Sequence, residues 1–116
     1  VSPSAVCMDD GKIFLSAGYG VGSMMIQVKL AGTDFSVSVL DEYKPALGFT
    51  SEQQTPLLYN GKLFSILTKD SGPLRLQFAC VDPSDARKIL WSSGKETRFG
   101  YGPYFIADNK LVIFAR

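Results

Sequence analysis

Glycines cluster in one stretch of the sequence, SAGYGVGSMM at 16–25. A glycine-rich loop can hold a phosphate group when it ends in Gly-Lys-Ser/Thr, or when it forms a G-x-G-x-x-G fingerprint followed by a helix. Here Ser23 stands where the fingerprint needs its third glycine, and no lysine follows before Lys29. We therefore expect a turn between two strands, with positive φ angles at its glycines. The candidate ligand-contacting residues of this turn are Gly18, Tyr19, Gly20 and Gly22.

The residue types that usually carry catalysis or bind metals are few in this chain. It has no histidine, so neither a Ser-His-Asp triad nor a Cys-His pair can be built from it. Two cysteines without histidine cannot complete a tetrahedral zinc site, and we expect Cys7 and Cys80 to be buried free thiols. Asp41 and Glu42 are adjacent, and neighbours on a strand point to opposite faces, which argues against a glycosidase pair. The sequence predicts no catalytic residues, no cofactor and no metal ligands of its own.

The composition is that of an ordinary globular domain. The 116 residues are 46% hydrophobic, 12% aromatic and 20% charged. The formal net charge is +1, without a basic or an acidic block, so nothing favours nucleic acid or an anionic membrane as a partner. No apolar run reaches the roughly 18 residues that a membrane span needs. The chain begins with Val1 and stops within the apolar run KLVIFAR, so we expect it to be part of a longer protein.

A hairpin signal recurs three times along the chain, as DGKIFL at 10–15, NGKLFS at 60–65 and DNKLVI at 108–113. The lysines of consecutive copies are 50 and 48 residues apart. Asp-Gly and Asn-Gly supply the positive φ angles that a tight hairpin turn requires. Self-similarity at this spacing predicts a repeat architecture.

Alternation of apolar and polar residues inside the repeat predicts strands. MMIQVKL at 24–30 lies 50 residues before LRLQFAC at 74–80, which aligns Gln27 with Gln77. Both segments alternate with a period of two, so each strand presents one apolar face. We expect no helix, and strands at 4–8, 12–16, 24–30, 36–41, 55–59, 63–67, 74–81, 88–92, 103–107 and 111–115.

Four short strands in each repeat of 48–50 residues are typical of a β-propeller blade, because a four-stranded sheet must cover its faces with its neighbours. We therefore expect an all-β fold in which four-stranded antiparallel sheets form the blades of an incomplete propeller. The first blade spans about 3–42, the second about 54–93, and a third begins at about 102–116. A closed ring needs at least about four blades, so we expect either further blades or self-association.

The second unit resembles the blade motif of the pyrroloquinoline-quinone-like (PQQ-like) propellers, A-x-D-x-x-x-G-K-x-x-W. In FACVDPSDARKILW, Ala79, Asp82, Lys88 and Trp91 lie in this pattern, while an insertion near Asp85 and Arg87 in the glycine position depart from it. SAGYGVGSMMIQVKL, TPLLYNGKLFSIL and GYGPYFIADNKLVIF also look like consecutive blades of bacterial extracytoplasmic proteins with these repeats. The resemblance covers nearly the whole chain.

The resemblance implies an architecture and a function. In such propellers the blade tryptophan packs against the neighbouring blade, so Ala79, Asp82, Lys88 and Trp91 are expected to be blade-docking residues; the first unit has Leu40 in place of Trp91. The implied function is a non-catalytic scaffold that holds a protein or a small ligand in the periplasm or outside the cell. The alternative is a part of an oxidoreductase that depends on PQQ and calcium, with its active site in blades outside this chain.

Overall fold

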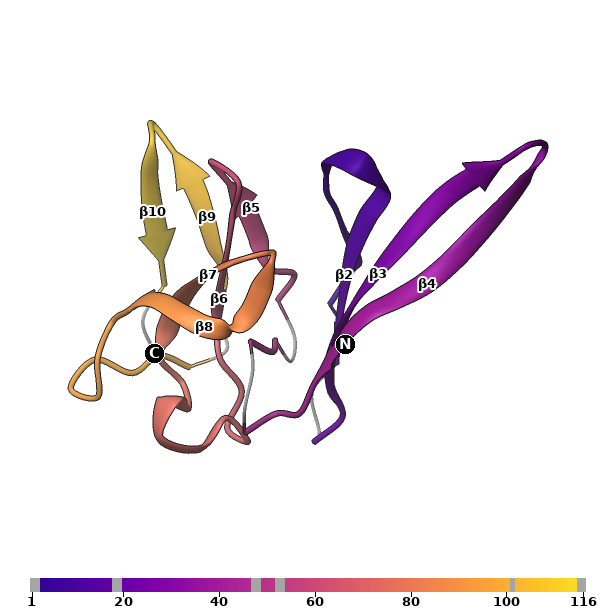
Figure 1. Ribbon diagram of the computed structural model, residues 1–116. Helices are drawn as coiled ribbons and strands as arrows, with labels where there is room; N and C mark the ends of the chain where they lie inside the picture. Colours follow the sequence, from indigo (N-terminus) through magenta and orange to yellow (C-terminus); the bar gives the residue numbers. More distant parts are fainter. Residues whose placement is uncertain (1–2, 18–19, 47–48, 52–53, 101, 115–116) are drawn as a thin grey trace.

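The computed structural model describes residues 3–17, 20–46, 49–51, 54–100 and 102–114. The chain is all-β, and the ten strands found in these residues form two four-stranded antiparallel sheets and one two-stranded sheet (Figure 1). The described residues also contain two short 3-10 turns, η1 (Asp9–Gly11) and η2 (Gly72–Leu74). The expected all-β class and the four-stranded antiparallel sheets are therefore confirmed.

Each strand pairs with the strand that follows it within its sheet, so every sheet is a simple meander. The first sheet contains β1 (Val6–Cys7), β2 (Lys12–Ala17), β3 (Gly22–Ala31) and β4 (Asp34–Tyr43). The second sheet contains β5 (Leu57–Tyr59), β6 (Lys62–Ile66), β7 (Phe78–Asp82) and β8 (Asp85–Ser92). The third sheet contains β9 (Tyr104–Ala107) and β10 (Lys110–Ile113).

The turn residues behave as their types predict. Asp10 and Gly11 have φ angles of 64° and 73°, and Asn60 and Gly61 have φ angles of 51° and 73°. Asp, Asn and Gly tolerate this left-handed conformation better than other residues do. The strands that flank these turns are consequently held in tight hairpins at the positions expected from the sequence.

One expected strand is shorter than its sequence pattern. The alternating segment 74–81 becomes extended only at Phe78, because η2 occupies its start and Leu76 has a φ angle of 60°. A left-handed residue ends an extended run, so the first half of the alternation does not lie in a sheet. Gln77, expected on a polar face, is instead buried beside η2, where its side-chain nitrogen donates to the Pro73 carbonyl at 3.3 Å.

The three sheets stack face to face in chain order (Figure 1). One apolar cluster joins the first sheet to the second, and another joins the second to the third. We call the face that a sheet turns toward the following sheet its forward face, and the opposite face its rear face. Because side chains alternate along a strand, each residue can be assigned to one of them.

The forward faces carry Val6, Phe14 and Met25 on the first sheet, Leu57, Phe64 and Phe78 on the second, and Phe105 and Val112 on the third. The rear faces carry Ile13, Leu15, Met24 and Ile26 on the first sheet, Leu63, Ala79 and Val81 on the second, and Tyr104, Leu111 and Ile113 on the third. Among the described residues, the second sheet is therefore covered on both faces, and the first and third sheets are each covered on one face.

Strand pairing corrects the alignment of the repeats. Met25 pairs with Phe14 and Asp41, and Cys80 pairs with Phe64 and Trp91, so Met25 corresponds to Cys80 and Asp41 to Trp91. The expected matches of Gln27 with Gln77 and of Leu40 with Trp91 are wrong.

Two opposite length differences explain the wrong alignment. The β2–β3 connection is five residues shorter than the β6–β7 connection, and the β3–β4 hairpin is five residues longer than the β7–β8 hairpin. These two differences cancel. Equivalent residues in the second strands of the two sheets, and equivalent residues in their fourth strands, are therefore both 50 residues apart in the sequence.

The longer hairpin extends beyond the rest of the molecule (Figure 1). Its outer part, which we call the arm, comprises residues 28–37, where β3 and β4 pair only with each other. Leu30, Phe35 and Val37 lie on the rear side of the arm and are exposed. The second sheet has a shorter hairpin at this place, which turns at Pro83 and Ser84.

The described sheets do not close into a ring. Across the described ranges, no helix is long and apolar enough to cross a membrane.

Candidate functional site

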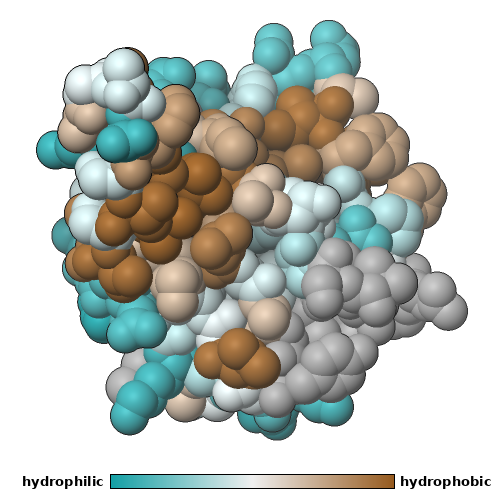
Figure 2. Space-filling view, turned by 90° about the vertical axis from the view of Figure 1, so that its right-hand side faces the viewer, coloured by the Kyte–Doolittle hydropathy of each residue, from teal (hydrophilic) through white to brown (hydrophobic). Residues whose placement is uncertain are grey.

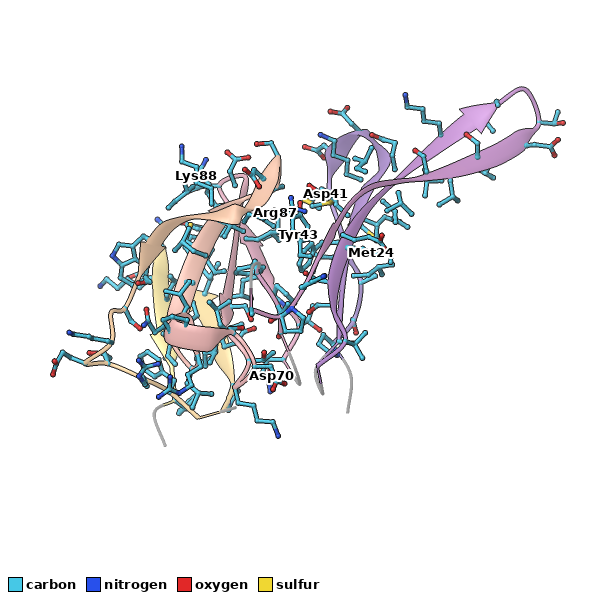
Figure 3. The ribbon with its side chains drawn as sticks, turned by 60° about the horizontal axis from the view of Figure 1, so that its bottom comes forward. Met24, Asp41, Tyr43, Asp70, Arg87 and Lys88 are labelled. Carbon is cyan, nitrogen blue, oxygen red and sulfur yellow. The ribbon has the colours of Figure 1, made fainter. Side chains whose placement is uncertain are left out.

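Charged side chains meet where the outer strands of the first two sheets lie opposite each other. Arg87 on β8 donates from Nη1 to Asp41 Oδ2 at 2.5 Å and from Nη2 to Asp41 Oδ1 at 2.7 Å. The same Nη2 donates to the Glu42 carbonyl at 2.9 Å, and the guanidinium carbon lies 4.7 Å from the centre of the Tyr43 ring. Figure 3 shows Asp41, Tyr43 and Arg87 pointing toward one another across the gap between the strands. This bidentate arrangement fixes how the two sheets face each other.

The electrostatics of this contact follow from its exposure. The hydrogen bonds from Arg87 are the main cause that holds the pKa of Asp41 below its usual value, and Asp41 in turn raises the pKa of Arg87. Both side chains remain accessible to water, so the pair contributes mainly to orientation. Burial raises the pKa of Tyr43, whose hydroxyl oxygen accepts a hydrogen bond from the Ala86 amide at 3.4 Å.

The segment that leads from the first sheet to the second is fixed by serines of the first sheet. The Ser23 hydroxyl donates to the Phe49 carbonyl at 2.6 Å, and the Phe49 amide donates to the Ala86 carbonyl at 3.0 Å. The Ser51 amide donates to the Ser16 hydroxyl oxygen at 2.7 Å, and that hydroxyl donates to the Ser51 carbonyl at 3.0 Å. These bonds satisfy backbone groups that the buried link would otherwise leave without partners.

Three buried hydroxyl groups form a cluster behind this link. The oxygens of Thr50, Thr68 and Ser71 lie 3.2–3.3 Å from one another, and all three residues are almost completely buried. The β6–β7 connection supplies Thr68 and Ser71, and the link supplies Thr50. Since each hydroxyl can donate and accept, the cluster satisfies itself and holds the connection against the link.

The second and third sheets are joined by two tyrosines. The Tyr104 hydroxyl lies 3.0 Å from the Ser65 hydroxyl and donates to the Thr55 carbonyl at 3.2 Å, and burial raises the pKa of Tyr104. At the exposed edge, the Tyr59 hydroxyl donates to Asn109 Oδ1 at 2.8 Å. The polar groups of both junctions therefore hold successive sheets together.

The four expected docking residues do not converge on one site. Ala79 is buried against the first sheet, while Trp91 lies on the opposite face with 55% of its surface exposed and its ring 6.5 Å from that of Phe78, edge to face. Asp82 accepts from the amide and hydroxyl of Ser84 at 2.9 and 2.8 Å and so stabilises the β7–β8 turn. Lys88 is exposed on β8 and points away from the core (Figure 3). Their role in docking a further blade stays a prediction.

The glycine-rich loop is described only in part. Gly18 and Tyr19 lie outside the described residues, while Gly20 and Gly22 have φ angles of 79° and 102°, as expected. A hollow of about 480 Å³ lies beside the loop on the rear face of the first sheet. Its lining is largely apolar, includes Leu15, Val21 and Met24, and has Glu42 and Lys44 at its edge. Ligand contact at this loop stays a prediction.

Of the two cysteines, Cys80 is buried as expected, whereas Cys7 is not. Burial raises the pKa of the Cys80 thiol, and Cys7 is exposed because no sheet among the described residues covers the rear side of β1. Within the ranges that the structure describes, no group of three or more His, Cys, Asp or Glu side chains could hold a metal ion.

The sequence reasoning missed the contact of Arg87 with Asp41. The one signal for it was a departure from the blade motif, since Arg87 stands in the position of the motif's glycine. Asp41 gave no signal, because its partner is 46 residues away in the sequence. Comparisons of this chain with protein-family models, with curated proteins and with solved structures find no match.

Proposed function

We propose that this chain belongs to a non-catalytic scaffold of the PQQ-like β-propeller kind, which holds a protein or a small ligand outside the cytoplasm. The observation that carries the proposal is the face-to-face stack of successive antiparallel sheets, in which each meander begins with a short antiparallel hairpin. Blades of a propeller stack in this way because each four-stranded sheet needs a neighbour on both faces.

The polar contacts support a scaffold. Arg87 and Asp41 engage each other and the backbone between the first and second sheets, and Tyr104 and Ser65 do so between the second and third. Side chains committed to such contacts rigidify the stack. A rigid stack presents its connecting loops in fixed positions, and loops on a rigid framework are the usual place for binding residues.

The proposal is tested on the product of the complete gene. Its intact mass is recorded first, and electron microscopy then shows whether its sheets form a ring. A non-circular arrangement of sheets would overturn the propeller.

Activity is tested on the same product by titrating PQQ and calcium, separately and together, while quinone absorbance and melting temperature are recorded. A scaffold shows no calcium-dependent change in either quantity. A bound quinone spectrum with a melting temperature that rises only when both are present would instead identify the quinone-dependent oxidoreductase. Cell fractionation tests the location, and recovery in the cytoplasmic fraction would contradict it.

A further inference from the structure

We infer that the outer edge of β4 pairs with the same edge of a second copy of this chain, antiparallel and about a twofold axis at Val37. Both copies use the same surface, so the contact is closed and isologous. The inference goes beyond the proposed function and does not depend on it. Sheets that stack face to face cover each other's faces, and the outer edge of β4 stays open whether or not such sheets close into a ring.

The edge is open along its outer part. β4 is the last strand of the first sheet, and among the described residues it pairs only with β3. Residues 34–40 are all exposed, and most of them belong to the arm, which extends beyond the rest of the molecule (Figure 1). The contact of β4 with the second sheet lies further along the strand, at Asp41 and Tyr43. The outer part of the edge is therefore accessible to another strand.

The backbone groups of this edge point in a defined direction. β3 and β4 are joined by a two-residue turn, which is closed by the pair of Ala31 with Asp34. A closing pair of this kind is hydrogen-bonded, and hydrogen-bonded pairs alternate along an antiparallel ladder with pairs that are not. Phe35, Val37 and Val39 therefore point their N–H and C=O groups away from β3. An extended strand is the partner that satisfies such a row of donors and acceptors.

A comparison with the second sheet shows that this edge lacks the usual protection. Natural edge strands are kept from pairing by charged residues, prolines or bulges. β8, the equivalent edge strand, has Arg87 and Lys88 near its middle, and its pairing with β7 shifts register at two places. β4 has neither charge nor proline from Phe35 to Leu40, and its pairing is regular up to Val39. An edge without protection is expected where the native protein pairs it.

The residues of this edge make a second copy of β4 a suitable partner. FSVSV, at 35–39, alternates apolar residues with serine, and the pattern is the same when it is read in reverse. In an antiparallel pair about Val37, Phe35 lies opposite Val39 of the other copy, and serine lies opposite serine. Pairs of aromatic with β-branched residues, and pairs of hydroxyl residues, stabilise neighbouring strands. Each apolar residue of one copy therefore meets an apolar residue of the other.

Other registers are less favourable. If the axis lay one residue further along the strand, Asp34 would approach Glu42 of the other copy, and like charges opposite each other are destabilising. If it lay one residue earlier, Val39 would face the turn residue Thr33. The axis at Val37 avoids both arrangements.

The arm itself gains from a second copy. Leu30, Phe35 and Val37 lie on its rear side and are 65%, 73% and 64% exposed. Figure 2 looks onto this side of the molecule and shows apolar side chains gathered on it. A hairpin of two strands with nothing packed on it is marginally stable in water, whereas three or more strands with an apolar face are stable. Two paired arms form a four-stranded sheet with its apolar residues side by side.

The first experiment tests the axis by charge exchange. Sedimentation velocity of the complete gene product is recorded over a range of concentrations for the unmodified protein, Val37→Lys, Val37→Glu and an equimolar mixture of these two variants. Each residue 37 faces its own copy across the axis, so like charges block the pairing of either variant alone, and opposite charges restore it in the mixture. Val28→Lys is the matched control, because Val28 is the partner of Val37 on the same side of the arm but lies on β3.

The second experiment separates backbone pairing from side-chain packing. Val37→Pro removes the N–H that points away from β3, and proline is tolerated at such a position of an edge strand. Val37→Thr keeps this N–H and the β-branched shape but makes the side chain polar. Circular dichroism melting confirms that each variant is folded, and Val39→Pro replaces Val37→Pro if the latter fails to fold.

Edge pairing predicts a specific set of results. The unmodified protein and Val28→Lys dimerise as concentration rises, whereas Val37→Lys, Val37→Glu and Val37→Pro each stay monomeric. The mixture of the two charged variants dimerises, and Val37→Thr dimerises with an affinity within about threefold of the unmodified protein.

Four results would overturn the inference. A monomeric unmodified protein would leave the edge to a strand of a different protein, and a dimer of Val37→Pro would exclude backbone pairing. A monomeric Val37→Thr would mean that two apolar faces pack together instead. A mixture of charged variants that does not associate would exclude the axis at Val37. The ring and the quinone titration are unaffected by all four results, so failure here is distinguishable from failure of the proposed function.

Discussion

The first and second sheets have the same strand order and the same hairpin signals, yet they differ in burial. Both also have a bulge at the same point of their third and fourth strands, beside Met25 in one sheet and Cys80 in the other. The second sheet lies between two others, and four consecutive residues of β7 are buried. The first sheet buries only its forward face. Position in the stack, and not the local pattern, therefore decides which apolar residues are buried.

The largest expected effect on stability comes from a comparison of two equivalent residues, one in each of the first two sheets. Leu63→Ala removes a completely buried side chain and leaves a cavity, so we expect it to lower the free energy of unfolding by about 3 kcal/mol. Ile13→Ala is expected to cost about 1 kcal/mol, because Ile13 is already in contact with water. Urea unfolding at low protein concentration measures both. Equal costs would contradict the difference between the two sheets.

A smaller effect is expected at Trp91. Its ring is more than half exposed and has an edge contact with Phe78, so Trp91→Ala should lower the free energy of unfolding by about 1 kcal/mol. The same urea experiment measures it, with Phe78→Ala, expected to cost about 4 kcal/mol, as the buried reference. A cost of about 3 kcal/mol or more for Trp91→Ala would show that a further surface covers the ring.

The two tyrosines between the second and third sheets allow a buried hydrogen bond and an exposed one to be compared by their contributions to stability. Tyr104→Phe removes a buried hydroxyl that bonds to Ser65 and to the Thr55 carbonyl, and should cost about 1 kcal/mol. Tyr59→Phe removes a bond that water can replace, and should cost less than about 0.5 kcal/mol. Thermal unfolding of both variants measures which substitution lowers the stability more. A larger loss for Tyr59→Phe would show that the exposed edge of the junction contributes more to stability than its buried part.

The smallest effect concerns Asp41 and is expected to depend on pH. Arg87 lowers the pKa of Asp41 in the folded state, so the carboxylate stabilises the fold at pH values above its unfolded pKa of about 3.9. This contribution disappears as the pH falls through the lower pKa of the folded state. The stability difference between the unmodified chain and Asp41→Asn should therefore be greatest near neutral pH and shrink below about pH 4.

Urea midpoints at several pH values, with and without 1 M salt, measure the effect of Asp41→Asn. Salt should reduce it, because both side chains are exposed to water. Arg87→Gln is the matched control, since the effect of Asp41→Asn should vanish in its background. An effect that persists without Arg87 would assign the stabilisation to another partner of Asp41.

Most of the secondary structure could be predicted from the sequence. Turns such as Asn60-Gly61 and the alternation of Met24 to Leu30 act over a few residues, so they place the strands correctly. The start of β7 could not be placed, because the conformation of Leu76 depends on η2 and on hydrogen bonds to Leu67 and Phe99. The alignment of the third strands also failed, because two compensating length differences conceal each other when only sequence spacing is compared.

Much less of the candidate site could be predicted. Trp91 and Asp82 were expected at a blade junction, whereas the observed junction between the first two sheets uses Arg87 and Asp41. Their contact forms only when two sheets stack, and no short sequence pattern contains both residues. The candidate glycine loop could be located, since its turn conformation is local, but a ligand for it could not be inferred from the sequence.

Short antiparallel strands in units of about 50 residues follow from the sequence alone, because turn chemistry and side-chain alternation are local properties. The packing of the sheets is what places Met25 in the core and leaves the more apolar side of β3 uncovered by the described residues. This could not be read from the pattern, because both sides of β3 carry an apolar residue at the level of the core. Which side is buried depends on the sheet that packs against it, and that sheet lies a whole repeat away.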